Sequence, residues 1–191
     1  MSAAILASTR FQRFALAGLS MGGALALNMA RWVPDRVERL AILDANPGPD
    51  DDARKANRRR QIADAERMGV GELTRRELAG LYLAPQNQTP EMVELAVSMA
   101  ERHGLDVYKR QQNALMARQS SRPFLAQIKA PALVLCGQED TLCLPQWHEE
   151  MAQQMPNSQL MQIVGAGHLS TLEAPGEVNA ALKNWLGHRQ N

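Results

Sequence analysis

The chain has 191 residues, 45% of them hydrophobic, which is enough to bury one substantial core with a small appended subdomain. Lysine and arginine number 21 against 20 aspartates and glutamates, so no excess of charge favours a nucleic-acid partner. No apolar run is long enough to span a bilayer, and Arg10 and Arg13 follow rather than precede the N-terminal apolar run, so we expect a cytoplasmic protein with no membrane partner.

A strand, a helix and a second strand are predicted near the start of the chain. The run 14–17 is uniformly apolar, which suits a strand buried on both faces of a sheet. Helix-forming residues follow over 21–29, and residues 37–43 form the next apolar run, which ends at Asp44. A strand-helix-strand unit of this kind implies parallel pairing with a right-handed crossover.

The stretch from residue 50 to about residue 121 differs in character. It is rich in Arg, Glu, Gln, Met and Ala at helical spacing, and it contains no convincing strand. The run Asp50 to Asp52 suits a helix N-terminus, and Thr89-Pro90-Glu91 marks another helix start. We interpret residues 50–121 as a helical insertion in a core formed by residues 1–49 and 122–191.

The insertion carries the main basic run of the chain, at Arg54-Lys55 and Arg58-Arg59-Arg60. We expect a solvated helix face with Asp50 to Asp52 as counter-charges. A site for an anionic substrate or a nucleic acid is the alternative interpretation of the same charges.

The alternation of strands and helices resumes after the insertion. Residues 132–136 and 160–164 are predicted strands, and helices are expected over about 146–154 and 176–186. The pattern as a whole predicts an α/β fold built on a parallel sheet.

The two cysteines, Cys136 and Cys143, are expected to be reduced, one in a buried strand and the other in a loop. A disulfide between them is the alternative. No HExxH, CxxC or clustered His/Asp spacing supports a metal site, and no cofactor is expected.

The segment Gly18-Leu19-Ser20-Met21-Gly22-Gly23 places a serine on a sharp turn between the first predicted strand and helix. Such a turn is typical of a nucleophile elbow, in which the backbone lifts the hydroxyl out of the sheet. A serine hydroxyl is a poor nucleophile until a neighbouring base takes its proton, and that base needs an acid to orient it. A nucleophilic Ser20 therefore predicts a base and an orienting acid at the ends of later strands.

One candidate for each role follows a later strand, in the order serine, acid, histidine. Asp140 lies in Gly137-Gln138-Glu139-Asp140, directly after the strand that ends at Cys136. His168 lies in Gly165-Ala166-Gly167-His168, directly after the strand that ends at Val164. Glycines around His168 permit a tight backbone path that points the imidazole over the sheet.

Other residues could fill the same roles less well. Asp44 also follows a strand and is the rival acid, whereas Glu139 is expected to point away from Asp140. The remaining histidines are expected at the surface: His103, His148 and His188.

These motifs resemble the α/β-hydrolase superfamily, specifically its small cap-bearing esterases, lactonases and cofactor-free haloperoxidase relatives. The resemblance implies that Ser20 is the nucleophile, His168 the general base and Asp140 the orienting carboxylate. It also implies that the backbone N–H of Met21 donates to the oxyanion, and that the insertion is the family's cap. By the same resemblance the chain is expected to lack the family's early strands and the second oxyanion donor that follows one of them.

The implied reaction is hydrolysis of a small carboxylic ester or lactone through an acyl-enzyme, as in a carboxylesterase or a 3-oxoadipate enol-lactonase. A carbon–carbon bond hydrolase with the same triad is one alternative. An inactive fragment or binding module, which keeps the elbow but lacks a competent oxyanion hole, is another.

Overall fold

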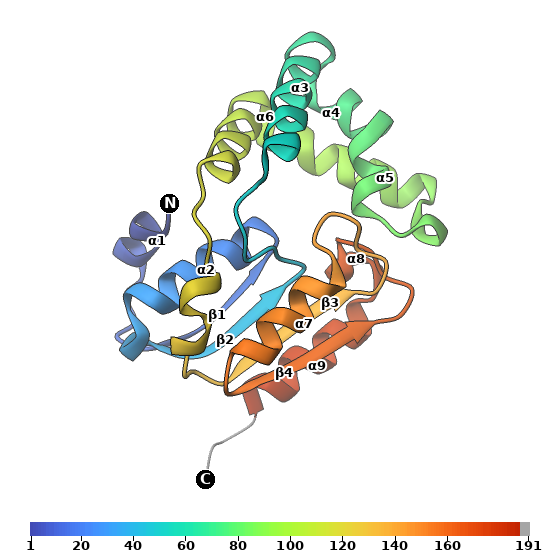
Figure 1. The fold of residues 1–191 in the computed structure, drawn as a ribbon. Coiled ribbons are helices and arrows are strands. Elements are labelled where there is room, and N and C mark those ends of the chain that lie inside the picture. Colours follow the sequence, from blue (N-terminus) through green and yellow to red (C-terminus); the bar gives the residue numbers. More distant parts are fainter. Residues whose placement is uncertain (188–191) are drawn as a thin grey trace. The chain divides into compact units, whose positions relative to one another are not determined.

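A computed structural model describes residues 1–187, which fall into two compact units (Figure 1). Unit 1 consists of Met1–Pro47 together with the chain from Ser121 onward, and unit 2 is Gly48–Ser120. The boundaries lie within two residues of those expected for the core and the insertion.

Unit 1 contains one parallel sheet in the order β1-β2-β3-β4. Its strands are β1 (Phe14–Leu19), β2 (Val37–Leu43), β3 (Ala132–Gly137) and β4 (Ser158–Ile163). All three strand pairs are parallel. Every residue of β3 is buried, as expected of an inner strand covered on both faces, whereas the edge strands β1 and β4 each contain two exposed residues. The predicted α/β fold with a parallel sheet is confirmed.

Helices cover both faces of this sheet (Figure 1). Along β3, Val134 packs with α2 and α7 on one face, and Leu133 and Leu135 pack with α9 on the other. The helical elements of unit 1 are α1 (Ser2–Ser8), α2 (Met21–Trp32), η1 (Pro34–Arg36), η4 (Arg122–Gln127), α7 (Pro145–Gln154), α8 (Ser170–Glu173) and α9 (Pro175–Gly187).

Unit 2 is helical throughout its described elements. These are α3 (Asp52–Met68), α4 (Val70–Leu73), the π-helical turn η2 (Thr74–Leu78), α5 (Ala79–Tyr82), η3 (Pro85–Asn87) and α6 (Pro90–Met116). Two predicted helix starts are present: the side chain of Asp51 accepts from the N–H of Arg54 at 2.7 Å, and Thr89 caps α6. The unit has its own apolar core around Leu73, which includes Ala65, Val70, Leu78 and Tyr108.

Asp50 is a counter-charge to the basic run, as expected, but the expectation of a solvated face is wrong at this position. Its carboxylate is fully buried in unit 2 and pairs with Arg58 at 2.5 Å and Arg118 at 2.9 Å. Arg58 also donates to Gln112, so part of the predicted basic surface is an internal ion-pair network. A buried carboxylate needs such partners because its desolvation is otherwise costly.

Within residues 1–187, every helix is too short or too polar to cross a bilayer.

Candidate active site

Ser20 stands at the carboxyl end of β1 as the N-cap residue of α2. Its φ of 54° is unusual for a residue other than glycine, and the turn is held by its N–H, which donates to the carbonyl of Leu43 on β2 at 2.9 Å. A Cβ on Gly18 would lie 2.2 Å from the carbonyl oxygen of Gly22, so this close return of the backbone requires glycine. The predicted elbow is therefore present as a strained strand-to-helix turn.

Ser20, His168 and Asp140 form a chain of hydrogen bonds within unit 1. The Nε2 of His168 lies 2.9 Å from the Oγ of Ser20, and its Nδ1 lies 2.9 Å from Oδ2 of Asp140. The carboxylate accepts from the Nδ1–H, which leaves Nε2 able to accept from the serine hydroxyl. Asp140 and His168 are buried, and Ser20 is half-buried.

Two loops at the carboxyl end of the sheet hold this arrangement. The N–H groups of Leu142 and Cys143 both donate to Oδ1 of Asp140 at 2.8 Å, which fixes the carboxylate so that Oδ2 faces the imidazole. The N–H of Glu139 donates to the carbonyl of Ala166 at 2.9 Å, so the loop after β3 is tied directly to the loop that carries His168.

Gly137, at the end of β3, allows these two loops to approach. A Cβ at this position would lie 2.2 Å from the carbonyl oxygens of both Ala166 and Gly167, immediately before His168. Sequence reasoning missed this role. The sequence shows a glycine after an apolar strand, but it does not show that the loop before His168 packs against this glycine.

The side chains around His168 stabilise the imidazolium that forms when the ring takes a proton. Burial of the imidazole opposes that charge, but the side chains of Asp140 and Cys143 outweigh burial and raise the pKa of His168. A carboxylate that stabilises the imidazolium is what proton transfer from a serine requires.

Asp44, the rival acid, lies elsewhere in the hydrogen-bond network. Its buried carboxylate accepts from the N–H of Gly137 at 2.9 Å and from the hydroxyl of Ser170 at 2.5 Å. Burial raises the pKa of Asp44 to about 7, against the lowering effects of Ser170 and His168. Asp44 thus links the end of β2 to the end of β3 and to Ser170, two residues after His168. The imidazole of His168 hydrogen-bonds to Asp140 and not to Asp44.

The structure corrects one expectation for the remaining histidines. His148 is fully buried on α7 rather than at the surface. Its Nε2 accepts from the N–H of Ala45 at 2.8 Å, so the ring proton is on Nδ1, which donates to the carbonyl of Leu144 at 3.2 Å. His103 is exposed on α6, and His188 lies outside the described residues.

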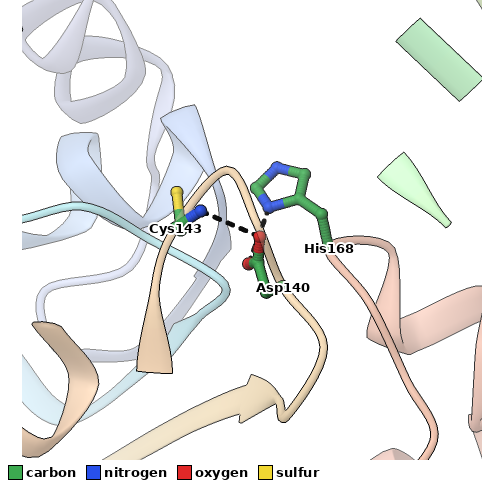
Figure 2. Close-up of side chains that lie close together, drawn as sticks. All are labelled: Asp140, Cys143 and His168. Atoms are coloured by element: carbon green, nitrogen blue, oxygen red, sulfur yellow. Dashed lines mark hydrogen bonds and ion pairs between the residues drawn. The ribbon is translucent and has the colours of Figure 1, made fainter. Parts of the chain in front are cut away.

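Met21 and Cys143 complete the surroundings of the triad. Met21 is the first residue of α2, a position whose N–H finds no acceptor within the helix. Cys143 was expected only as a loop thiol, and it is buried and reduced beside Asp140 and His168 (Figure 2). The hint in the sequence was its position three residues after Asp140, because the turn at Asp140 folds the chain back on the carboxylate.

Comparison with known proteins agrees with this architecture. The family model described as the alpha/beta hydrolase family matches residues 2–181. Among solved structures, a thermophilic esterase from Thermogutta terrifontis, in a malate-bound form, has a TM-score of 0.83 and 32% identity. That match covers 92% of this chain and 65% of the esterase.

Two further relatives extend the comparison. An enol-lactonase from Burkholderia xenovorans LB400 has a TM-score of 0.85 at 22% identity, and the match covers 96% of this chain and 69% of the enol-lactonase. At this identity the match supports the fold alone. RutD of Serratia proteamaculans, a protein provisionally described as a carbamate hydrolase, is 29% identical over 177 residues. That alignment covers 91% of this chain and 66% of RutD, so the chain spans about two thirds of the length of this relative.

Proposed function

Because this chain belongs to the alpha/beta hydrolase family, we propose that it is a serine hydrolase that cleaves a small carboxylic ester or lactone through an acyl-enzyme on Ser20. The observation that carries the proposal is the hydrogen-bonded chain from Ser20 through His168 to Asp140 at the carboxyl ends of β1, β3 and β4. The 32% identity with an esterase supports the same substrate class.

In the proposed mechanism each side chain has one step. The Oγ of Ser20 attacks the ester carbonyl while its proton moves to Nε2 of His168, 2.9 Å away. Asp140 keeps the Nδ1–H of His168 in place and stabilises the imidazolium that forms. The imidazolium then gives its proton to the leaving alcohol. A water molecule, deprotonated by the same Nε2, hydrolyses the acyl-enzyme and restores the Ser20 hydroxyl.

The developing oxyanion would be met by the N-terminus of α2. In this proposal the backbone N–H of Met21 donates to the oxyanion, and the positive end of the helix macrodipole adds to its stabilisation. The proposal includes unit 2 as the family's cap.

Carbamate hydrolysis is a second candidate, favoured by the similarity to RutD. The same nucleophile and base would attack a carbamate carbonyl, whose nitrogen makes it less electrophilic than an ester. The two candidates differ in the leaving group that His168 must protonate, an alcohol in one case and an amine in the other.

The proposal is tested by rapid-mixing hydrolysis of p-nitrophenyl acetate, with an alkyl N-(p-nitrophenyl) carbamate, whose leaving group is p-nitroaniline, in parallel. A serine hydrolase releases a burst of p-nitrophenol equal to the enzyme present when deacylation is slower than acylation, and mass spectrometry then finds the acyl group on Ser20. Ser20→Ala should abolish both signals. Acylation of another residue, or equal turnover by wild type and Ser20→Ala, would contradict the assignment. A higher kcat/KM for the carbamate would favour the second candidate.

A further inference from the structure

Two residues of the triad and Cys143 bring three different metal-ligating side chains together at the carboxyl end of the sheet. Ligand atoms of Asp140, Cys143 and His168 all lie within 4.8 Å of one another, and each residue is buried, with less than a tenth of its surface exposed. Figure 2 shows Cys143 and His168 on either side of the Asp140 carboxylate, with the imidazole directed toward that carboxylate. We propose that Cys143, His168 and Asp140 form a binding site for a thiophilic divalent cation such as Zn²⁺, and that the bound cation inhibits the triad.

The donor set favours zinc over magnesium or calcium. A thiolate sulfur, an imidazole nitrogen and a carboxylate oxygen are the ligands that Zn²⁺ takes, whereas Mg²⁺ and Ca²⁺ prefer oxygen alone. Zinc–ligand bonds of about 2.0–2.3 Å place tetrahedral neighbours roughly 3.5 Å apart. Atoms that already lie within 4.8 Å of one another therefore need shifts of about 1 Å, within the reach of side-chain rotation.

Charge also balances in the occupied site. Binding releases the Cys143 thiol proton to solvent and forms the sulfur–metal bond, so the dication meets one thiolate and one carboxylate. The buried cluster then carries no net charge, which limits the cost of desolvating it. Two backbone N–H groups already orient Asp140 through Oδ1, leaving Oδ2 directed toward the cluster.

Inhibition follows from which nitrogen the cation takes, and this part rests on the proposed function. Nδ1 of His168 faces Asp140, so a cation bound between them replaces the Nδ1–H···Oδ2 hydrogen bond. The single proton of the neutral ring must then sit on Nε2, the nitrogen that faces Ser20. In that state Nε2 cannot accept the serine proton.

The site is tested by adding Co²⁺ to the metal-free wild-type chain and recording the near-ultraviolet charge-transfer band of a cobalt–thiolate bond. We expect this band in wild type and in Cys136→Ser, in which Cys143 is the remaining thiol of the chain. We expect its loss in Cys143→Ser, together with a fall of about tenfold or more in Zn²⁺ affinity by titration calorimetry. Absence of the band from wild type, its loss in Cys136→Ser, or its persistence in Cys143→Ser would each overturn the site. The Cys136→Ser result decides the matter even if Cys143→Ser does not fold.

A second arm separates binding from inhibition. Zn²⁺ should slow the reaction of wild-type Ser20 with a fluorophosphonate in proportion to site occupancy, and EDTA should restore the rate. A cobalt–thiolate band without any effect of Zn²⁺ on labelling would overturn the inhibitory role. If Ser20 fails to react even without metal, the proposed hydrolase function fails, and the cobalt band still supports or overturns the cation site by itself.

Discussion

Replacing Gly137 by alanine tests whether the end of β3 positions His168, the proposed general base. The new Cβ would lie 2.2 Å from the carbonyl oxygens of Ala166 and Gly167, whereas ordinary contact begins at 3.4 Å. Either the strand or the His168 loop must therefore move by about 1 Å, and a misplacement of that size can lower a rate by about 10². We expect kcat/KM for p-nitrophenyl acetate to fall by about two orders of magnitude, with a loss of about 1–3 kcal/mol in unfolding free energy.

Gly176→Ala is the matched control for this substitution. Gly176 is exposed in the first turn of α9, and a Cβ there meets nothing within 4 Å. Alanine at this position should leave both kcat/KM and the melting temperature close to wild type. Both variants are assayed at a temperature at which circular dichroism shows them fully folded. Wild-type kcat/KM in Gly137→Ala would refute the claim that this contact places His168.

Four further substitutions test other parts of the account. Asp140→Asn should lower kcat for ester hydrolysis by about 10⁴, and Asp44→Asn should stay within about tenfold of wild type; the reverse order would make Asp44 the orienting acid. His148→Gln should remove a pH dependence of stability, because burial lowers the pKa of His148 from 6.5 to about 4. In wild type the neutral ring stabilises the fold fully above pH 6.5, and this stabilisation, about 3 kcal/mol in total, is lost as the pH falls toward 4. If the unfolding free energies of the two proteins, measured in urea at several pH values, change with pH in the same way, this reasoning is contradicted. Asp50→Ala should destabilise unit 2 by about 3–5 kcal/mol in calorimetry because it removes the buried partner of Arg58, and an unchanged melting profile would mean that the pair contributes nothing.

Strands and the serine turn were predictable because their signals are local. The apolar runs that became β2 and β3 are short, uniform and bounded by turn residues, and the structure places them at 37–43 and 132–137. The elbow was visible because its close backbone approach requires glycine at Gly18, two residues before the serine. The positions of Asp140 and His168 followed from the same logic, since the carboxyl ends of parallel strands meet at one edge of the sheet.

Features that depend on distant partners could not be predicted. His148 looks like any polar residue on α7, and only the N–H of Ala45, 103 residues earlier in the chain, makes it a buried acceptor. Asp50 looks like a residue of a helix N-terminus, and its burial depends on Arg118, 68 residues later. Side-chain charge alone gives no sign of such pairings.

The choice between Asp140 and Asp44 as the acid depends partly on local sequence and partly on distant partners. Both carboxylates follow buried strands, so the sequence pattern admits either as the acid. The structure separates them by partners: Asp44 is bonded to Gly137 and Ser170, while Oδ2 of Asp140 accepts from the imidazole. That difference depends on loop geometry, which apolar periodicity does not encode.

The most direct test of the account is the reaction of Ser20 with a fluorophosphonate probe. We predict that metal-free wild-type protein is labelled at one site, that peptide mapping places the label on Ser20, and that Ser20→Ala is not labelled. His168→Ala should fold and label far more slowly, because Nε2 then no longer takes the serine proton. Equal labelling of wild type and Ser20→Ala, or a label on another residue, would contradict the central claim that Ser20 is an activated nucleophile.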